Sequence, residues 1–239
     1  MKIINKNTVI LGDFDGTIIE NDGCDILMEN HSVPDWEEPG RNYLKKLISH
    51  AEMNDSFAKM LSANEAQLIK TIQKKIVIRK GFKKFVNLAK MNGVTLIVIS
   101  AGWELYIINT LKFLNFKYIE NNKMLLNHLR TNFSQIPLIT NKIVTVGSTN
   151  QWRIESPWLE QACQLSTPCK GSIASFLKKN NYNVIVIGNS ETDACMIDYA
   201  DLTFATGSLI KYLKNSQKKF ISFSIFDEIS NILFKEGQN

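Results

Sequence analysis

Two carboxylates lie almost side by side in the sequence, directly after an apolar run near the start of the chain. The run Val9-Ile10-Leu11 leads to Asp13 and Asp15, with one aromatic residue between the acids and Gly16-Thr17 after them. Two ionised carboxylates at such a short separation repel each other, so either one is protonated or a cation lies among them. A divalent ion held by few protein ligands keeps open positions for a phosphate oxygen, and the pattern therefore indicates metal-assisted phosphate chemistry.

Polar residues that could complete such a site follow two further apolar runs. Ser100 ends one run, and Asn189 ends another, with Asp193 four residues later. Lys170 stands at the start of a predicted helix just before the second of these runs. In doubly wound α/β sheets ligands bind beyond the carboxyl ends of the strands, so we expect these side chains to meet the two acids in one crevice.

The residue types in this crevice favour two kinds of interaction. An all-oxygen ligand set suits Mg²⁺, and the expected ligands are Asp13, Asp15, Asn189 and Asp193. Lysine supplies a compact positive charge, while hydroxyl and amide groups donate hydrogen bonds to phosphate oxygens. The groups expected to bind phosphate are Lys170, Ser100, the amides of Ala101 and Gly102, and Thr17.

Short β-branched runs and helical stretches alternate along most of the chain. The predicted strands are 8–13, 94–100, 183–189 and 219–224, with a shorter fifth candidate at 201–206. The predicted helices are 103–114, 171–179, 192–199 and 225–234. The runs at 94–100 and 183–189 are continuously apolar, which is typical of strands buried on both faces of a parallel sheet. The alternation predicts an α/β fold with a doubly wound, mostly parallel sheet.

Two stretches do not follow the alternation. Residues 20–78 are rich in Glu, Lys, Leu, Met and Asn with apolar residues at helical spacing, which predicts an all-helical insertion after the first strand. Residues 117–169 are irregular, with short strand-like pieces only around 142–146. We therefore expect a catalytic core made of residues 1–19 and 79–239 and a helical cap made of residues 20–78.

Composition excludes several classes of protein. The chain has 239 residues, a net charge of +5 and 44% hydrophobic residues, which is ordinary for a globular protein of this size. Its lysine pairs are scattered, so we expect solvated helix faces and no nucleic-acid partner. The absence of a long apolar run predicts no membrane partner. Four cysteines without C-x-x-C spacing and three histidines form no zinc-site pattern, so we expect reduced thiols and a cytoplasmic protein.

The ordered motifs resemble those of the haloacid dehalogenase (HAD) superfamily of phosphatases. The stretch Asp13-Phe14-Asp15-Gly16-Thr17 is similar to the first motif of that family, Ser100 to the second, Lys170 to the third, and Gly188 to Asp193 to the fourth. The resemblance implies a HAD-like Rossmannoid core. The helical insertion between the first and second motifs resembles a C1-type cap, as in the phosphoserine-phosphatase-like branch.

The resemblance also implies a role for each motif residue. Asp13 would attack phosphorus to form an aspartyl-phosphate, and Asp15 would protonate the leaving oxygen and later deprotonate water. Ser100 and Lys170 would bind the phosphoryl group. Mg²⁺ would be held by Asp13, the backbone carbonyl of Asp15 and the acids of the fourth motif. Asp22 occupies a place where this branch often carries an acid that faces the substrate, which makes it a candidate specificity residue.

One departure from the family pattern concerns the metal. Asn189 stands where the fourth motif usually begins with an acid, so one negative charge is missing. The leading hypothesis is a phosphomonoesterase for a small organic phosphate ester. A phosphotransferase of the same chemistry and a non-catalytic module that binds phosphate ligands remain alternatives. The chain would act as a monomer or homodimer.

The sequence motifs do not identify one substrate. The sequences "RKGF" at 79–82 and "CKG" at 169–171 are similar to the bacterial phosphatases of methionine salvage. Specificity in such enzymes depends on cap residues, which the motifs do not identify.

Overall fold

A parallel sheet carries the predicted motifs in the computed structural model. The described residues are 3–120, 129, 135–147, 151–158, 162–163 and 165–234. Within them the strand order is β3-β4-β2-β1-β6-β7-β8, and every pair along this path is parallel. The remaining strand, β5, pairs antiparallel with the end of β4. The predicted doubly wound, mostly parallel α/β fold is confirmed.

The elements follow the predicted alternation. The strands are β1 (Thr8–Gly12), β2 (Thr95–Trp103), β3 (Lys117–Glu120), β4 (Gln135–Thr145), β5 (Trp152–Glu155), β6 (Asn183–Gly188), β7 (Leu202–Ala205) and β8 (Ile221–Ser222). The helices are α1 (Gly23–His31), α2 (Glu38–Leu44), α3 (His50–Met60), α4 (Glu65–Lys75), α5 (Phe82–Met91), α6 (Glu104–Phe113), α8 (Lys170–Lys179), α9 (Ala194–Ile197), α10 (Leu209–Asn215) and α11 (Phe226–Leu233). No helix within these ranges is long and apolar enough to cross a membrane.

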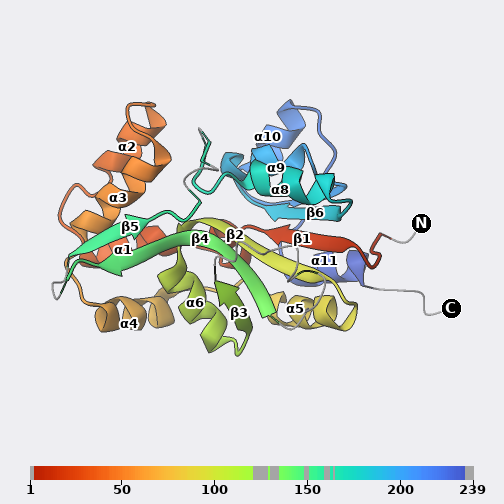
Figure 1. The fold of residues 1–239 in the computed structure, drawn as a ribbon, viewed down its shortest axis with the longest axis horizontal. Helices are drawn as coiled ribbons and strands as arrows, with labels where there is room; N and C mark the ends of the chain where they lie inside the picture. Colours follow the sequence, from red (N-terminus) through yellow and green to blue (C-terminus); the bar gives the residue numbers. More distant parts are fainter. Residues whose placement is uncertain are drawn as a thin grey trace.

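Helices cover both faces of the sheet (Figure 1). Successive residues of β1 point to opposite faces, so Val9 and Leu11 pack with α8, α9 and α10, whereas Ile10 packs with α5, α6 and α11. Both faces are therefore dry, which explains why β1, β2 and β6 read as continuous apolar runs. Polar side chains are therefore accommodated at the ends of the strands, where they can reach solvent.

Helices α1 to α4 occupy the segment between β1 and α5. Ser49 and Asn64 form capping boxes at the starts of α3 and α4. Each side chain accepts from the backbone amide three residues on, and each backbone amide donates to the side chain of that residue. The two connections between this segment and the sheet are adjacent, because Ile19 and Ile78 form an antiparallel bridge. Arg79 fixes these connections by donating to the carbonyl groups of Thr17, Gly16 and Ser224.

The described part of residues 117–169, which the sequence left irregular, contains the strands β3, β4 and β5. β3 and the first half of β4 extend the parallel sheet, and the second half of β4 turns back through β5 as an antiparallel hairpin. The hairpin lies against the inserted helices, since Trp152 donates from Nε1 to the carbonyl of Ala63 at 2.8 Å. Tertiary contacts with residues 20–78 therefore stabilise strands that the local sequence does not predict.

Candidate active site

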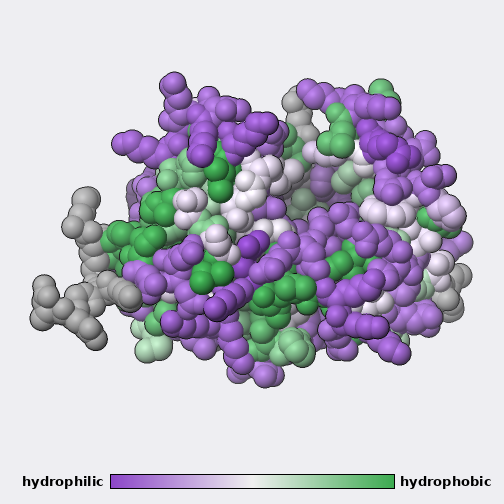
Figure 2. Space-filling model, turned by 180° about the vertical axis from the view of Figure 1, so that it is seen from behind, coloured by the Kyte–Doolittle hydropathy of each residue, from purple (hydrophilic) through white to green (hydrophobic). Residues whose placement is uncertain are grey.

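A cavity of about 520 Å³ lies at the carboxyl ends of the central strands, between the sheet and the inserted helices. Seen from behind, the surface is hollowed between the two upper groups of helices (Figure 2). Every predicted site residue except Thr17 and Asp193 lines this cavity. The strand ends therefore converge as the sequence predicted.

Three buried ionisable side chains lie together at the base of the cavity, which Asp13 and Lys170 border and Asp193 reaches through Lys170. We call Asp13, Lys170 and Asp193 the carboxylate–lysine cluster. Lys170 donates from Nζ to Asp13 Oδ1 and to Asp193 Oδ1, both at 2.6 Å. The three residues are at most 4% exposed. Burial opposes a charge on Lys170, but the two carboxylates raise the pKa of its ammonium group above the ordinary value. The lysine is therefore held as a fixed cation beside Asp13.

Asp13 carries a second hydrogen bond, which orients its carboxylate. The hydroxyl of Thr17 donates to Oδ2 at 2.9 Å from a tight turn over residues 14–18, in which Gly16 adopts φ 68°. Burial and the neighbouring Asp193 raise the pKa of Asp13 to about 7, against the lowering effects of Lys170 and Thr17. The structure thus directs the hydroxyl of Thr17 to Asp13.

Asp15 is held by three donors from three elements. Oδ2 accepts from the Ser100 hydroxyl at 3.1 Å and from the Tyr106 hydroxyl at 2.8 Å, and Oδ1 accepts from the amide of Gly23 at 2.8 Å. Burial, followed by the charges of Asp22 and Asp13, raises the pKa of Asp15 well above its ordinary value. A carboxyl group with a raised pKa can carry a proton to a leaving group near neutral pH.

Two residues of the fourth motif, Asn189 and Asp193, direct their side chains to different partners. Asp193 Oδ2 accepts from the amides of Asn189 and Ser190 at 2.8 and 3.1 Å, while its Oδ1 faces Lys170. The Asn189 side chain instead lies against the turn of the first motif, because a Cβ built on Gly16 would be only 2.0 Å from Asn189 Nδ2. Asn189 therefore borders the cavity beside Asp15, whereas the Asp193 carboxylate is directed to Lys170 and two backbone amides.

The donor set of the site suits a hard divalent cation. Asp13 and Asp15 border the cavity with the amide group of Asn189, and Lys170 supplies the one ammonium group among the cavity-lining residues described. Burial raises the pKa of both acids, so their joint ionisation requires additional positive charge. Oxygen ligands of this kind fit Mg²⁺.

The remaining predicted residues also border the cavity. Ser100 accepts from the amide of Gly102 at 2.9 Å, which shapes the loop after β2. Ala101 presents its carbonyl to Asn54 of α3 and Asn141 of β4, at 3.1 and 2.8 Å. Asp22 caps α1 by accepting from two backbone amides of its first turn, and burial raises its pKa.

The sequence did not identify three residues that hydrogen-bond to the motif residues without belonging to a motif. Tyr106 is buried, and it fits only because Gly23 and Gly102 have no side chains, since a Cβ on Gly102 would lie 1.6 Å from its hydroxyl. Its position six residues after Ser100, on a predicted helix, was the available signal. Asn54 and Asn141 gave no comparable signal, because both act through tertiary contacts with the carbonyl of Ala101.

The inserted helices line the cavity with a group of mainly apolar and aromatic side chains, beside the charged Glu37 and Arg41, and we call this group the pocket wall. Its members are Trp36, Tyr43, Leu44, His50, Met53 and Phe57. The ring of His50 packs edge-on against Tyr43, with centroids 5.5 Å apart, and its Nδ1 lies 3.2 Å from Asn54 Nδ2. Tyr43 also donates to the carbonyl of Leu165 at 2.8 Å, which joins α2 to the loop before Lys170. Burial, and then the charge of Lys170, lower the pKa of His50 to about 4.

Known proteins share both the sequence pattern and the fold of this chain. The phosphatase of Bacillus pumilus (strain SAFR-032) named for 2-hydroxy-3-keto-5-methylthiopentenyl-1-phosphate is 27% identical, over 98% of this chain and 96% of its own. The same-named protein of Geobacillus kaustophilus (strain HTA426) is 26% identical, over 96% and 97%. A phospho-aspartyl intermediate analogue of phosphoserine phosphatase is 16% identical with a TM-score of 0.66, over 96% of this chain and 100% of that one. This last likeness concerns the fold.

A family model matches the half of the chain that carries the first two motifs. The model described as haloacid dehalogenase-like hydrolase matches residues 10–142, more than half of the chain. The match includes the turn with Asp13 and Asp15 and the strand that ends in Ser100. The predicted resemblance and the enzyme class, a HAD-like phosphatase, are confirmed. The chain belongs to the haloacid dehalogenase-like hydrolases.

Proposed function

We propose that this chain is a Mg²⁺-dependent phosphomonoesterase that hydrolyses a small organic phosphate through an aspartyl-phosphate. The observation that carries the proposal is the geometry of Asp13, whose carboxylate borders the cavity with Lys170 at 2.6 Å behind it. A buried carboxylate with a fixed cation and two oriented oxygens is suited to in-line attack on phosphorus.

The first step transfers the phosphoryl group to the protein. A carboxylate oxygen of Asp13 forms a bond to phosphorus as the ester P–O bond breaks, and Asp15 gives its proton to the leaving oxygen. Tyr106 and Gly23 hold Asp15 at the edge of the cavity for this transfer. In the second step Asp15 takes a proton from water, whose oxygen bonds to phosphorus and releases Asp13. Lys170 offsets the charge on Asp13 throughout.

The metal site completes the charge balance. Asp13, the backbone carbonyl of Asp15 and the side-chain oxygen of Asn189 would hold Mg²⁺, which would offset negative charge on the phosphoryl oxygens. Ser100, with the amides of Ala101 and Gly102, would bind those oxygens. We assign Asp193 to holding Lys170, because its contacts face the lysine and the backbone. A neutral amide at position 189 is expected to weaken the affinity for Mg²⁺ relative to a carboxylate.

The pocket wall supports a substrate with an apolar tail. Trp36, Met53 and Phe57 line the same cavity as Asp13 and Lys170, and so does Asp22. This arrangement fits a short phosphate ester such as the compound for which the relatives are named. Residues 20–78 would form the cap and residues 1–19 and 79–239 the core, because both crossings meet at the Ile19–Ile78 bridge. We place the protein in the cytoplasm as a monomer or homodimer.

A phosphatase assay with two esters tests this proposal. Purified chain is incubated with 2-hydroxy-3-keto-5-methylthiopentenyl-1-phosphate and with phosphoserine, with Mg²⁺ and with chelator, and released phosphate is measured. We expect hydrolysis that requires Mg²⁺ and favours the ester with the apolar tail. Binding of both esters without release of phosphate would contradict the proposal and favour a non-catalytic module. Phosphate transfer to an added alcohol in preference to water would indicate a phosphotransferase.

A further inference from the structure

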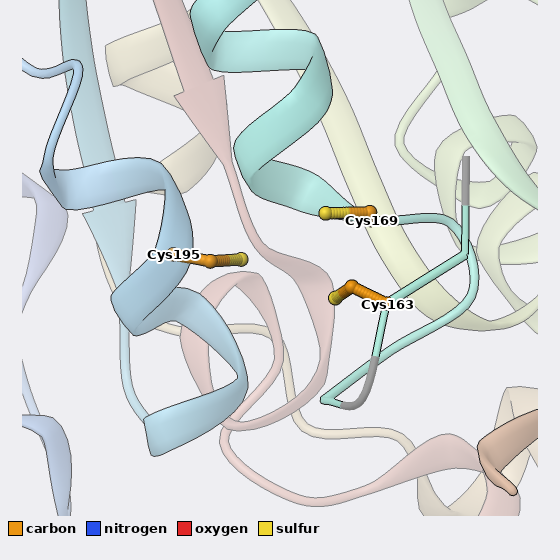
Figure 3. Close-up of side chains that lie close together, drawn as sticks. All are labelled: Cys163, Cys169 and Cys195. Carbon is orange, nitrogen blue, oxygen red and sulfur yellow. The ribbon is translucent and has the colours of Figure 1, made fainter.

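Three cysteines from three segments of the chain lie together near the starts of α8 and α9. The Sγ atoms of Cys163, Cys169 and Cys195 all lie within 4.8 Å of one another. Figure 3 shows the three side chains, from the loop before α8, the start of α8 and α9, directed into one gap. All three are partly buried free thiols. The spacings of 6 and 26 residues match no motif, so the cluster exists only through the fold.

The number and distances of the sulfur atoms decide what this gap could hold. A disulfide joins two sulfurs about 2.05 Å apart and would leave the third cysteine unused. A tetrahedral thiophilic ion with metal–sulfur bonds of about 2.3 Å separates its sulfur ligands by about 3.8 Å. The observed limit of 4.8 Å is close to this second value. The longest sulfur–sulfur separation has to shorten by at most about 1 Å for one ion to contact all three thiolates.

One backbone amide points at the cluster as it would at a metal-bound thiolate. The amide of Gly171 donates to Cys195 Sγ at 3.2 Å. The thiols of Cys163 and Cys195 donate to the carbonyls of Ser166 and Thr192, at 3.6 and 3.7 Å, and a bound ion would replace these two weak contacts. The Gly171 amide stabilises negative charge on Cys195, as metal ligation requires.

We propose that Cys163, Cys169 and Cys195 bind one thiophilic ion of the Zn²⁺ type, with a water molecule in the fourth position. Three thiolates favour such an ion over Mg²⁺, which prefers oxygen, so the site is separate from the oxygen site in the cavity.

The position of the cluster suggests what the ion would do. Cys169 directly precedes Lys170, and Cys195 follows Asp193 by two residues. The loop between Cys163 and Cys169 carries Leu165, whose carbonyl accepts from Tyr43. One ion would therefore cross-link the two elements that hold Lys170 and Asp193, and it would anchor the loop on which the pocket wall rests.

A Cd²⁺ titration tests the site directly. The reduced chain, with excess Mg²⁺ to occupy the oxygen ligands, is titrated with Cd²⁺ under nitrogen while thiolate-to-metal absorption is recorded in the ultraviolet. We expect saturation at one Cd²⁺ per chain. Cys163→Ser should weaken binding by at least about 10-fold. Cys24→Ser, which removes a thiol of the active-site cavity, should leave the titration unchanged and is the matched control.

A second measurement does not depend on the folding of a variant. Wild-type chain is alkylated with and without Zn²⁺, and each cysteine peptide is quantified by mass spectrometry. The proposal requires Zn²⁺ to protect Cys163, Cys169 and Cys195 together and to leave the labelling of Cys24 unchanged. It is overturned by equal alkylation with and without Zn²⁺, by protection of Cys24 alone, or by no absorption at one equivalent of Cd²⁺.

Discussion

The carboxylate–lysine cluster and the pocket wall meet at one cavity, but they are stabilised in different ways. The cluster consists of charges fixed by short hydrogen bonds, with Lys170 1% and Asp193 0% exposed. The wall consists mainly of apolar side chains on the inserted helices, and its Leu44 is 79% exposed. On the proposed mechanism the fixed charges would determine which bond is broken, and the apolar surface would determine which ester enters. Substitutions on the two sides should therefore change different kinetic constants.

The largest effect is expected from Asp13→Asn, on the charged side. The amide cannot attack phosphorus, so kcat should fall by at least about 10⁴-fold while the fold is kept. Steady-state hydrolysis with Mg²⁺ measures the loss, and circular dichroism checks the fold. Full activity of the variant would remove Asp13 from the mechanism.

Lys170→Met should reduce both activity and stability. It leaves Asp13 and Asp193 buried without their counter-charge, which should cost about 3–5 kcal/mol in the free energy of unfolding. Loss of the cation beside the phosphoryl group should lower kcat by about 10³-fold. Urea denaturation and kinetics measure the two effects. The matched control is Lys179→Met, an exposed position on the same helix, and an equal loss of stability there would contradict the account.

His50 links the two regions, because it belongs to the pocket wall and the charge of Lys170 lowers its pKa. Its pKa of about 4 in the folded protein lies below the ordinary value of 6.5. The unfolded chain therefore binds more protons between pH 6.5 and 4, and stability falls as the pH is lowered through this window. The loss should be about 3 kcal/mol. Urea denaturation at several pH values should find this part of the loss missing in His50→Gln; an unchanged pH dependence would refute the assignment.

Tyr106→Phe tests whether the hydroxyl positions Asp15. Removing a hydrogen bond to a carboxylate should lower kcat by about 10- to 100-fold, with little change in KM because the ring still fills its place between Gly23 and Gly102. Kinetics with one ester separate the two constants. A change in KM alone would place Tyr106 with the pocket wall.

The smallest effect is expected on the wall. Leu44→Ala should raise KM for an ester with an apolar tail by about 3- to 10-fold, since each buried methylene contributes about 0.8 kcal/mol. It should leave kcat and stability unchanged. Leu47 is 70% exposed and does not line the cavity, so Leu47→Ala is the control. Equal KM values for the two variants would show that Leu44 does not contact substrate.

The sequence predicted the charged residues at the strand ends better than the residues that depend on tertiary contacts. Asp13 and Lys170 were predictable, because parallel strands and helix starts bring their ends to one edge of the sheet whatever the connections are. Tyr106 was not singled out, because its one signal, a place on the predicted helix six residues after Ser100, fits a core residue equally well until its hydroxyl has a partner. The strands within 117–169 were hidden because Pro137 and Asn141 interrupt the pattern of β4. The three-cysteine cluster depends wholly on tertiary contacts.

The most direct test of the central claim is to trap the phosphorylated protein. The chain is mixed with phosphate ester and Mg²⁺, quenched in acid within one turnover and reduced with borohydride, which converts an aspartyl-phosphate to homoserine. Peptide mass spectrometry then locates the modification. We predict homoserine at position 13 and none in the Asp13→Asn variant. Turnover without any modified peptide, or modification at another residue, would contradict the mechanism.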